Sequence, residues 1–300
     1  MSTAQKAAVE EILRNAPLDL GGDPAVMRGV FRDMLAATPV PADVSTAPVT
    51  LGGVPTVRVD IDGAAGGGTV LHFHGGCYAI GSADTSVGLV SDIARRARAR
   101  AYSVDYRLAP ENRFPAAADD ALAAYRGLLG SGTPPASIVL TGESAGAGLA
   151  AETLIAANAA GLPLPSAVVL LSPWADLTQS GDSISANVGV DPSVTGKALQ
   201  IRADDYLSGA DPHDPMASPV FGDLAGLPPL LIQAGSHEVL LDDAVRLAAK
   251  AAAADVDVTL DIVSGVPHVF QAFAGILDEG AAALDRVAAF ITGRQLTGQA

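Results

Sequence analysis

Short apolar runs alternate with longer helical patterns over most of the chain. Val57, Val59 and Ile61 alternate with polar residues, as in a strand with one buried face. Further strands are expected at residues 69–73, 102–106, 137–140, 167–171, 230–233 and 256–263, with helices at 82–100, 115–130, 145–160 and 243–254. This alternation predicts an α/β fold in which helices cover both faces of a mostly parallel sheet.

Two segments, residues 1–45 and about 178–220, do not fit this alternation. Val26 and Val30 follow helical spacing in the first segment. The second segment is rich in Asp, Ser, Gly and Pro, and it interrupts the chain between two expected core strands. We expect residues 1–45 to form the N-terminal part of a cap. Residues 46–300 should form the catalytic domain with the second segment as a cap insertion, and the two cap segments should pack together over the active site.

Composition excludes several classes of protein. The 300 residues are 49% hydrophobic, enough for a large core, and Cys77 is the single cysteine, so an internal disulfide is impossible. No positively charged start followed by an apolar run opens the sequence, so we expect no signal peptide, and no apolar stretch approaches the length of a membrane span. The net charge of −15 would repel a phosphate backbone. We expect a cytoplasmic protein that binds neither membrane nor nucleic acid.

The strongest motif is Gly142-Glu143-Ser144-Ala145-Gly146, a G-x-S-x-G pattern between an expected strand and an expected helix. A serine on so sharp a turn needs small neighbours two positions to either side, and Gly142 and Gly146 provide them. The same pattern also occurs by chance in ordinary turns of glycine-rich chains. With this strand and helix around it, we expect Ser144 to be a nucleophile.

A second motif, His74-Gly75-Gly76, ends the strand expected at residues 69–73. Glycines there expose backbone amides, which can stabilise the negative charge that develops on an ester carbonyl oxygen. The candidate donors are the amides of Gly75, Gly76 and Ala145. The alternative is a simple glycine turn, and in either case we expect His74 to be structural.

Ser144 needs a base, and that base needs a carboxylate to orient it. Of five histidines, His268 follows the last expected strand and precedes a terminal helix, where the chain order Ser, acid, His places the base. Glu238 leaves the carboxyl end of the strand at residues 230–233, whereas Asp242 and Asp243 begin the next helix and fit capping roles. We expect Glu238 to be the acid, with Asp242 as the alternative.

These motifs together resemble the hormone-sensitive-lipase-like family (family IV) of bacterial esterases. The resemblance rests on His74-Gly75-Gly76, Gly142-Glu143-Ser144-Ala145-Gly146, Asp105-Tyr106-Arg107-Leu108-Ala109-Pro110-Glu111, Phe114-Pro115-Ala116, Ser172-Pro173-Trp174-Ala175-Asp176-Leu177 and Pro267-His268-Val269-Phe270. It covers most of the chain after about residue 60. It implies an α/β-hydrolase fold with a helical cap, no cofactor, and hydrolysis of short to medium acyl esters through an acyl-enzyme.

Two positions depart from the family pattern. Cys77 stands where a third glycine is common, and Glu238-Val239-Leu240 replaces the usual Asp-Pro-Leu. The chain also looks like monoterpene lactone hydrolases, some of which use Glu, so lactone hydrolysis is an alternative function. The candidate substrate-binding residues, which lie beside or within the motifs, are Cys77, Tyr78, Glu143 and Trp174.

Other functions remain possible on the same scaffold. A deacetylase or a lyase would need a similar nucleophile and oxyanion site, whereas a non-catalytic small-molecule receptor should have lost part of the triad. The acidic loop from Asp211 to Asp214 offers too few oxygen ligands for a cation, so no metal is expected. The expected partner is a small ester or lactone, and the resemblance allows a homodimer.

Overall fold

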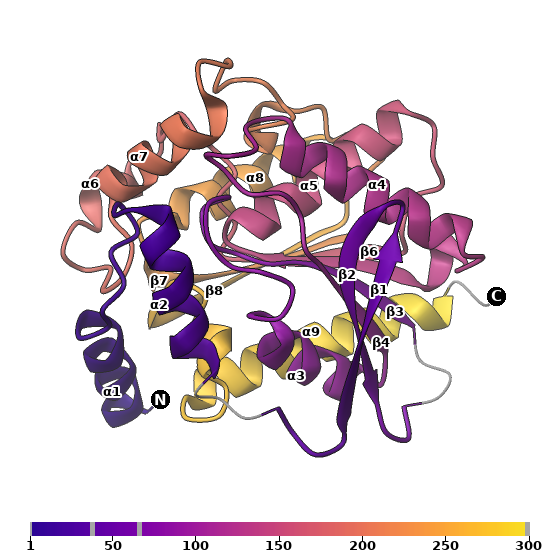
Figure 1. Ribbon diagram of the computed structural model, residues 1–300, viewed down its shortest axis with the longest axis horizontal. Helices are drawn as coiled ribbons and strands as arrows, with labels where there is room; N and C mark the ends of the chain where they lie inside the picture. Colours follow the sequence, from indigo (N-terminus) through magenta and orange to yellow (C-terminus); the bar gives the residue numbers. More distant parts are fainter. Residues whose placement is uncertain (1, 37–39, 65–67, 298–300) are drawn as a thin grey trace.

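An eight-stranded sheet forms the centre of the molecule in the computed structural model, which describes residues 2–36, 40–64 and 68–297 (Figure 1). The strand order is β1-β2-β4-β3-β5-β6-β7-β8. The strands are β1 (Val44–Leu51), β2 (Val54–Ile61), β3 (Thr69–Phe73), β4 (Arg100–Val104), β5 (Ile138–Glu143), β6 (Ala167–Leu171), β7 (Leu230–His237) and β8 (Val258–Pro267). Strands β3 to β8 run parallel, and β1 and β2 pair in antiparallel fashion. The predicted α/β class is therefore confirmed.

Helices cover both faces of this sheet (Figure 1). They are α1 (Thr3–Arg14), α2 (Pro24–Ala36), α3 (Val87–Ala97), α4 (Ala116–Gly130), α5 (Ala145–Ala159), α6 (Ser183–Ala186), α7 (Gly196–Leu207), α8 (Leu241–Ala253) and α9 (Asp278–Thr297), with short 3-10 turns at Pro135–Ser137, Pro219–Phe221 and Phe270–Phe273. Helices α4, α5 and α8 bury apolar residues against one face, and α3 and α9 against the other. None of the helices in the described ranges has the length and apolar character needed to cross a bilayer.

One strand was not expected, and several element boundaries differ from the sequence prediction, among them those of α3 and β4. Strand β1 was not expected, because an edge strand that buries only Leu51 completely carries a weak hydrophobic pattern. Helix α3 begins at Val87 rather than at Ser82 or Asp84. It ends at Ala97 because Arg98 adopts a left-handed conformation with φ 54°, and Arg100 already belongs to β4.

The N-terminal segment and residues 178–220 lie on the same side of the molecule, where α1, α2, α6 and α7 are grouped (Figure 1). The Arg14 side chain donates to the backbone oxygens of Gly189 (2.9 Å) and Val190 (3.5 Å). Residue 1 and residues 37–39 of the N-terminal segment lie outside the described residues. The division into a cap and a catalytic domain remains a proposal, which these contacts support.

Candidate active site

Ser144 occupies the turn between β5 and α5, with φ 56° and ψ −122°. Close packing explains both flanking glycines. A Cβ atom at Gly142 would lie 2.2 Å from the Gly146 oxygen, and one at Gly146 would lie 2.0 Å from the Phe73 oxygen. The strained serine conformation is therefore enforced by its surroundings, as expected for a nucleophile at a strand-to-helix turn.

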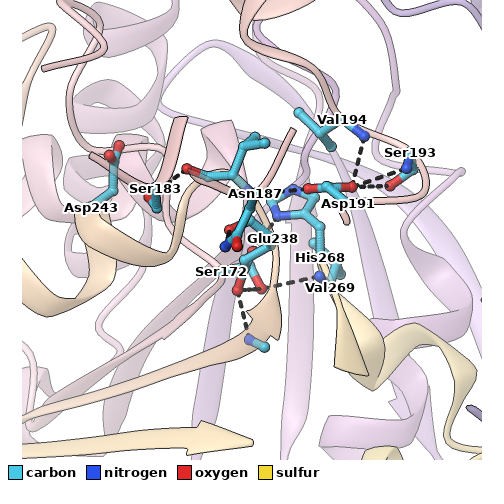
Figure 2. A network of polar contacts seen from close by, with 12 residues as sticks. Ser172, Ser183, Asn187, Asp191, Ser193, Val194, Glu238, Asp243, His268 and Val269 are labelled. Carbon is cyan, nitrogen blue, oxygen red and sulfur yellow. Dashed lines mark hydrogen bonds and ion pairs between the residues drawn. The ribbon is translucent and has the colours of Figure 1, made fainter. Parts of the chain in front are cut away.

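His268 and Glu238 form a close polar contact in the site (Figure 2). The Nδ1 atom of His268 lies 2.6 Å from Oε2 of Glu238. The second carboxylate oxygen of Glu238 accepts hydrogen bonds from the Gly235 amide (2.6 Å) and from the Ser172 hydroxyl (3.2 Å). The Ser172 hydroxyl also accepts from the amide of Val269 (3.0 Å), next to His268. The carboxylate is thereby fixed in the orientation that holds the imidazole.

The other two carboxylates near Glu238 have different partners. Asp242 accepts a hydrogen bond from the Ser183 amide at 2.9 Å. Asp243 accepts from the amides of Ala175 (2.8 Å) and Asp176 (2.9 Å). The geometry therefore brings Glu238, and neither aspartate, to His268.

The charge state of His268 depends on its acidic neighbours. Burial lowers the pKa of His268, but the hydrogen bond to Glu238 and the negative charges of Glu238, Asp191 and Glu143 raise it above its usual value of 6.5. A raised pKa makes His268 a stronger base, which is what removal of a serine proton requires.

Sheet order brings Ser144 and His268 to one edge. Ser144 follows β5, and its amide donates to the Leu171 oxygen at the end of β6 (2.9 Å). His268 follows β8, whose Pro267 pairs with His237 at the end of β7. Ser144 and His268 share no hydrogen bond in this structure. Such contacts often form only with bound substrate.

The loop that follows β3, residues 74–80, is called the glycine loop below. The Gly75 amide donates to Oε1 of Glu143 at 2.8 Å, so the prediction that Gly75 is an oxyanion donor does not fit the structure. Among the described residues, the amides of Gly76, Cys77 and Ala145 donate to no acceptor. Within the glycine loop, the amides that are free to bind an oxyanion are therefore those of Gly76 and Cys77, not those of Gly75 and Gly76.

Glu143 was predicted to contact substrate, but its carboxylate is occupied elsewhere. Besides the Gly75 amide, Oε1 accepts from the Ser86 hydroxyl (2.9 Å), and Oε2 lies 2.7 Å from Nε2 of buried His72. Burial raises the pKa of Glu143, but the charge of His72 and the Gly75 amide outweigh burial and lower it. The ionised Glu143 therefore holds the glycine loop through its hydrogen bond from the Gly75 amide.

The other three predicted substrate-binding residues are buried. Cys77 is 4% exposed, and Tyr78 and Trp174 are fully covered. The Trp174 amide donates to the Ser144 oxygen at 3.0 Å, which places its backbone beside the nucleophile. Burial raises the pKa of the Cys77 thiol to about 12, so the thiol remains protonated and unreactive. Substrate contact by these side chains stays a prediction.

The remaining histidines are separate from the Glu238–His268 pair. His74 stacks on Tyr106 with ring centroids 4.1 Å apart, and its Nδ1 atom lies 2.7 Å from the Gly75 oxygen. Burial lowers the pKa of His74 more than its hydrogen bond to Gly75 raises it, so this ring is neutral. His213 pairs with Asp211 in an exposed loop. No three His, Cys, Asp or Glu side chains within the described ranges are arranged to hold a metal ion.

Sequence reasoning missed two residues that support the acid. Ser172 bridges Glu238 and Val269, and the resemblance through Ser172-Pro173-Trp174 was the only signal for it. Asp191 accepts the Val239 amide at 3.0 Å, and it also binds the amides of Ser193 and Val194 (Figure 2). Nothing in the sequence distinguished Asp191 from other loop aspartates.

Comparisons with known proteins agree with this geometry. A family model described as an alpha/beta hydrolase fold matches residues 70–272. An acetyl-hydrolase of Streptomyces hygroscopicus is 45% identical over 233 residues, 78% of this chain and 77% of the relative. An esterase of Acinetobacter venetianus is 36% identical over 281 residues, 93% of this chain and 92% of the relative.

Solved structures extend the likeness to nearly the whole chain. The crystal structure of an esterase from the bacterial hormone-sensitive lipase family superposes with a TM-score of 0.95 at 41% identity, covering 98% of this chain and 99% of the other. A hormone-sensitive lipase from a metagenome library gives a TM-score of 0.93 at 37% identity, covering 97% and 98%. This chain therefore belongs to the hormone-sensitive-lipase family of α/β hydrolases and is an ester hydrolase.

Proposed function

We propose that this ester hydrolase cleaves small, short-chain carboxylic esters, with Ser144 as nucleophile, His268 as general base and Glu238 as the orienting acid. The 2.6 Å contact between His268 and Glu238, beside the strained turn of Ser144, carries the proposal. Short acyl chains are favoured because the relative from Streptomyces hygroscopicus is an acetyl-hydrolase.

Acylation begins when substrate closes the contact between Ser144 and His268. Nε2 of His268 takes the hydroxyl proton as the serine oxygen attacks the ester carbonyl carbon. The negative charge of Glu238 stabilises the imidazolium that forms. The imidazolium then returns its proton to the leaving alkoxide, which departs as the alcohol and leaves an acyl-serine.

The developing oxyanion needs fixed donors. The free amides of Gly76, Cys77 and Ala145 supply them in this proposal, which replaces the set that included Gly75. The Ala145 amide is at the N-terminus of α5, where no intrahelical acceptor exists and the helix dipole favours negative charge. Removal of a single such donor typically costs a factor of about 10² to 10³ in kcat.

Deacylation repeats the chemistry with water. His268 removes a proton from water, the hydroxide attacks the acyl carbonyl carbon, and the same proton returns to Ser144 as the carboxylic acid leaves. The proposed cap, residues 1–45 and about 178–220, would limit the size of the acyl or alcohol group, since its second segment contacts the residues around Glu238. All steps use groups of this chain and the two substrates.

A graded series of p-nitrophenyl esters, from acetate to decanoate, tests the proposal with wild-type protein and Ser144→Ala. We expect the highest kcat/KM for the acetate or butyrate ester and loss of nearly all turnover in Ser144→Ala, with unchanged melting temperature. Including one lactone tests the alternative function, which remains a prediction. Full activity of a well-folded Ser144→Ala variant would contradict the proposal.

We also propose that the protein is a cytoplasmic homodimer. A chain with one buried cysteine suits a reducing compartment. Strand β8 lies at the edge of the sheet, where Leu260 and Ile262 are each 38% exposed and a second copy can pair. Sedimentation equilibrium should give twice the chain mass of 30.1 kDa. A mass equal to that of one chain would contradict the dimer.

A further inference from the structure

The glycine loop contains three consecutive residues in the left-handed region. Gly76 has φ 113°, Cys77 has φ 54° and Tyr78 has φ 59°. For the two residues with a Cβ atom this conformation is unfavourable, and it persists only where the surroundings hold it. Because the amides of Gly76 and Cys77 are proposed oxyanion donors, whatever holds Tyr78 also aims those amides.

Tyr78 is held by its side chain, which is completely buried. Its ring stacks on Tyr206 of α7 with centroids 4.0 Å apart and planes within 3°. The ring of Trp174 lies 5.8 Å away on a tilted plane. The Tyr78 hydroxyl donates to Oε1 of Glu152 at 2.9 Å. This hydrogen bond ties the glycine loop to α5, the helix that begins directly after Ser144.

Glu152 is a buried carboxyl group that the proposed reaction does not use. It is 0% exposed, and no cation pairs with it among the described residues. Its Oε2 atom and the Tyr206 hydroxyl are both buried without a hydrogen-bond partner in the described part of the chain. An isolated buried carboxylate is costly, so these surroundings favour the protonated form.

The titratable groups that face Glu152 come from four segments. They are Tyr78 of the glycine loop, Tyr106 after β4, Tyr206 of α7 and Asp214 of the loop after α7. Burial raises the pKa of Glu152 to about 8. The hydrogen bond from Tyr78 lowers that pKa, and the charge of Asp214 raises it. Glu152 is therefore neutral at pH 7 and ionises in the mildly alkaline range.

We propose that Glu152 is a positioning residue that fixes the oxyanion-binding amides through its hydrogen bond to Tyr78. The inference rests on the proposed function, because it assumes that the glycine loop receives the oxyanion. A neutral Glu152 holds Tyr78 without placing a charge behind the loop. An ionised Glu152 would place a negative charge behind it, in a low-dielectric interior where like charges repel strongly.

The sign of the pH effect follows from this arrangement. Below about pH 8 Glu152 is neutral and the transition state meets no repulsion from it. Above about pH 8 the carboxylate forms and destabilises the oxyanion, so kcat declines. Glu152→Gln keeps an acceptor for Tyr78 and cannot ionise, so it should retain most of the kcat and lack the alkaline decline.

The experiment measures kcat, KM and melting temperature on p-nitrophenyl acetate between pH 6 and 10 for five proteins. These are the wild type, Tyr78→Phe, Glu152→Ala, Glu152→Gln and the control Tyr125→Phe. Tyr125 is also fully buried, and its hydroxyl donates to the Pro163 oxygen at 2.7 Å, on α4 and away from the glycine loop. Its loss should match the stability effect of Tyr78→Phe without touching the oxyanion site.

We expect Tyr78→Phe and Glu152→Ala to lower kcat roughly tenfold with little change in KM, because misplaced donors weaken transition-state binding. Tyr125→Phe should keep the wild-type kcat. The proposal is overturned if Tyr78→Phe loses no more kcat than Tyr125→Phe, or if Glu152→Gln declines above pH 8 as the wild type does. A well-folded wild type that cleaves no ester would instead contradict the proposed function.

Discussion

Two loops on either side of Ser144 are held in different ways. The acid loop, residues 238–240 between β7 and α8, is held through its backbone by polar side chains of the 178–220 segment. Asp191 accepts from the Val239 amide at 3.0 Å, and Asn187 donates to the Glu238 oxygen at 2.7 Å (Figure 2). The glycine loop has one such backbone contact, from the Gly75 amide to Glu143, but it is also held by the buried side chain of Tyr78, which packs on Tyr206 and donates to Glu152.

The difference shows how partners set the charge of a buried carboxyl group. Glu143 and Glu152 each accept a hydrogen bond from one residue of the glycine loop, Glu143 from Gly75 and Glu152 from Tyr78. Burial raises the pKa of both groups, but His72 and the Gly75 amide keep Glu143 ionised, whereas the Tyr78 hydroxyl alone leaves Glu152 protonated at pH 7. Glutamate therefore acts as a charged group at position 143 and as a neutral hydrogen-bond acceptor at position 152.

Breaking the acid loop at Glu238 should have the largest effect. We expect Glu238→Gln to lower kcat by about 10³- to 10⁴-fold, because a neutral amide neither stabilises the imidazolium nor enforces the correct tautomer of His268. Asp242→Asn, whose carboxylate accepts from the Ser183 amide, is the matched control and should keep kcat within about threefold. Initial rates on p-nitrophenyl acetate with melting curves measure both. A larger loss in Asp242→Asn would make Asp242 the acid.

Substitution of Gly76 in the glycine loop should have the second-largest effect on kcat. A Cβ atom there would lie 2.2 Å from the Ile80 oxygen, and φ is 113°, so Gly76→Ala must shift the loop and its amides. We expect a loss of about 10² in kcat, the size seen when an oxyanion donor is removed. Gly88→Ala on α3 is the control, since a Cβ atom there meets nothing within 4 Å. If both variants keep the wild-type kcat, the glycine loop is not the oxyanion site.

Asp191→Asn, which removes one contact to the acid loop, should lower kcat less than the two preceding substitutions. The side-chain oxygen of the variant can still accept from the backbone amides of Ser193 and Val194. Its NH2 group replaces the second carboxylate oxygen, which accepts from the Val239 amide. We expect roughly a tenfold loss in kcat, because the acid loop relaxes, and about 1 kcal/mol less stability from the lost hydrogen bond. Ser185→Ala, on the same segment but exposed, should change neither quantity. Urea unfolding and initial rates test this, and an unaltered kcat in Asp191→Asn would show that the acid loop needs no such support.

The smallest expected effect is a shift of the pH profile. Catalysis needs neutral His268, whose pKa lies above 6.5, so kcat/KM should rise with pH through a midpoint above 6.5. Asp191→Asn removes one of the negative charges that raise this pKa, so the rising limb should move to lower pH. Profiles between pH 5 and 8 in constant ionic strength measure the shift. A limb that moves to higher pH would contradict this assignment of charges.

The sequence was sufficient for features with a local pattern. The alternation of strands and helices, the tight glycines around Ser144 and the position of His268 after the last strand each depend on residues close together in the chain. The choice of Glu238 over Asp242 was open because the two lie only four positions apart, between the end of β7 and the first turn of α8. Only their partners, His268 and Ser183, distinguish them.

Features that depend on distant contacts could not be predicted. The Gly75 amide is blocked by Glu143, 68 residues away, and the Val239 amide is held by Asp191, 48 residues away. Strand β1 was missed because its pattern is weak at an exposed edge. In each case the deciding partner comes from another element of the fold, which no local periodicity records.

The most direct test of the proposed triad is labelling by an organophosphate ester. The rate of labelling is measured, and peptide mass spectrometry identifies the labelled residue. The proposed triad predicts a single adduct on Ser144, formed at least roughly a hundred times more slowly in His268→Ala and Glu238→Gln and at the wild-type rate in Asp242→Asn. An adduct on another residue, or labelling of Ser144 that is unaffected by loss of His268 and Glu238, would contradict the proposed triad.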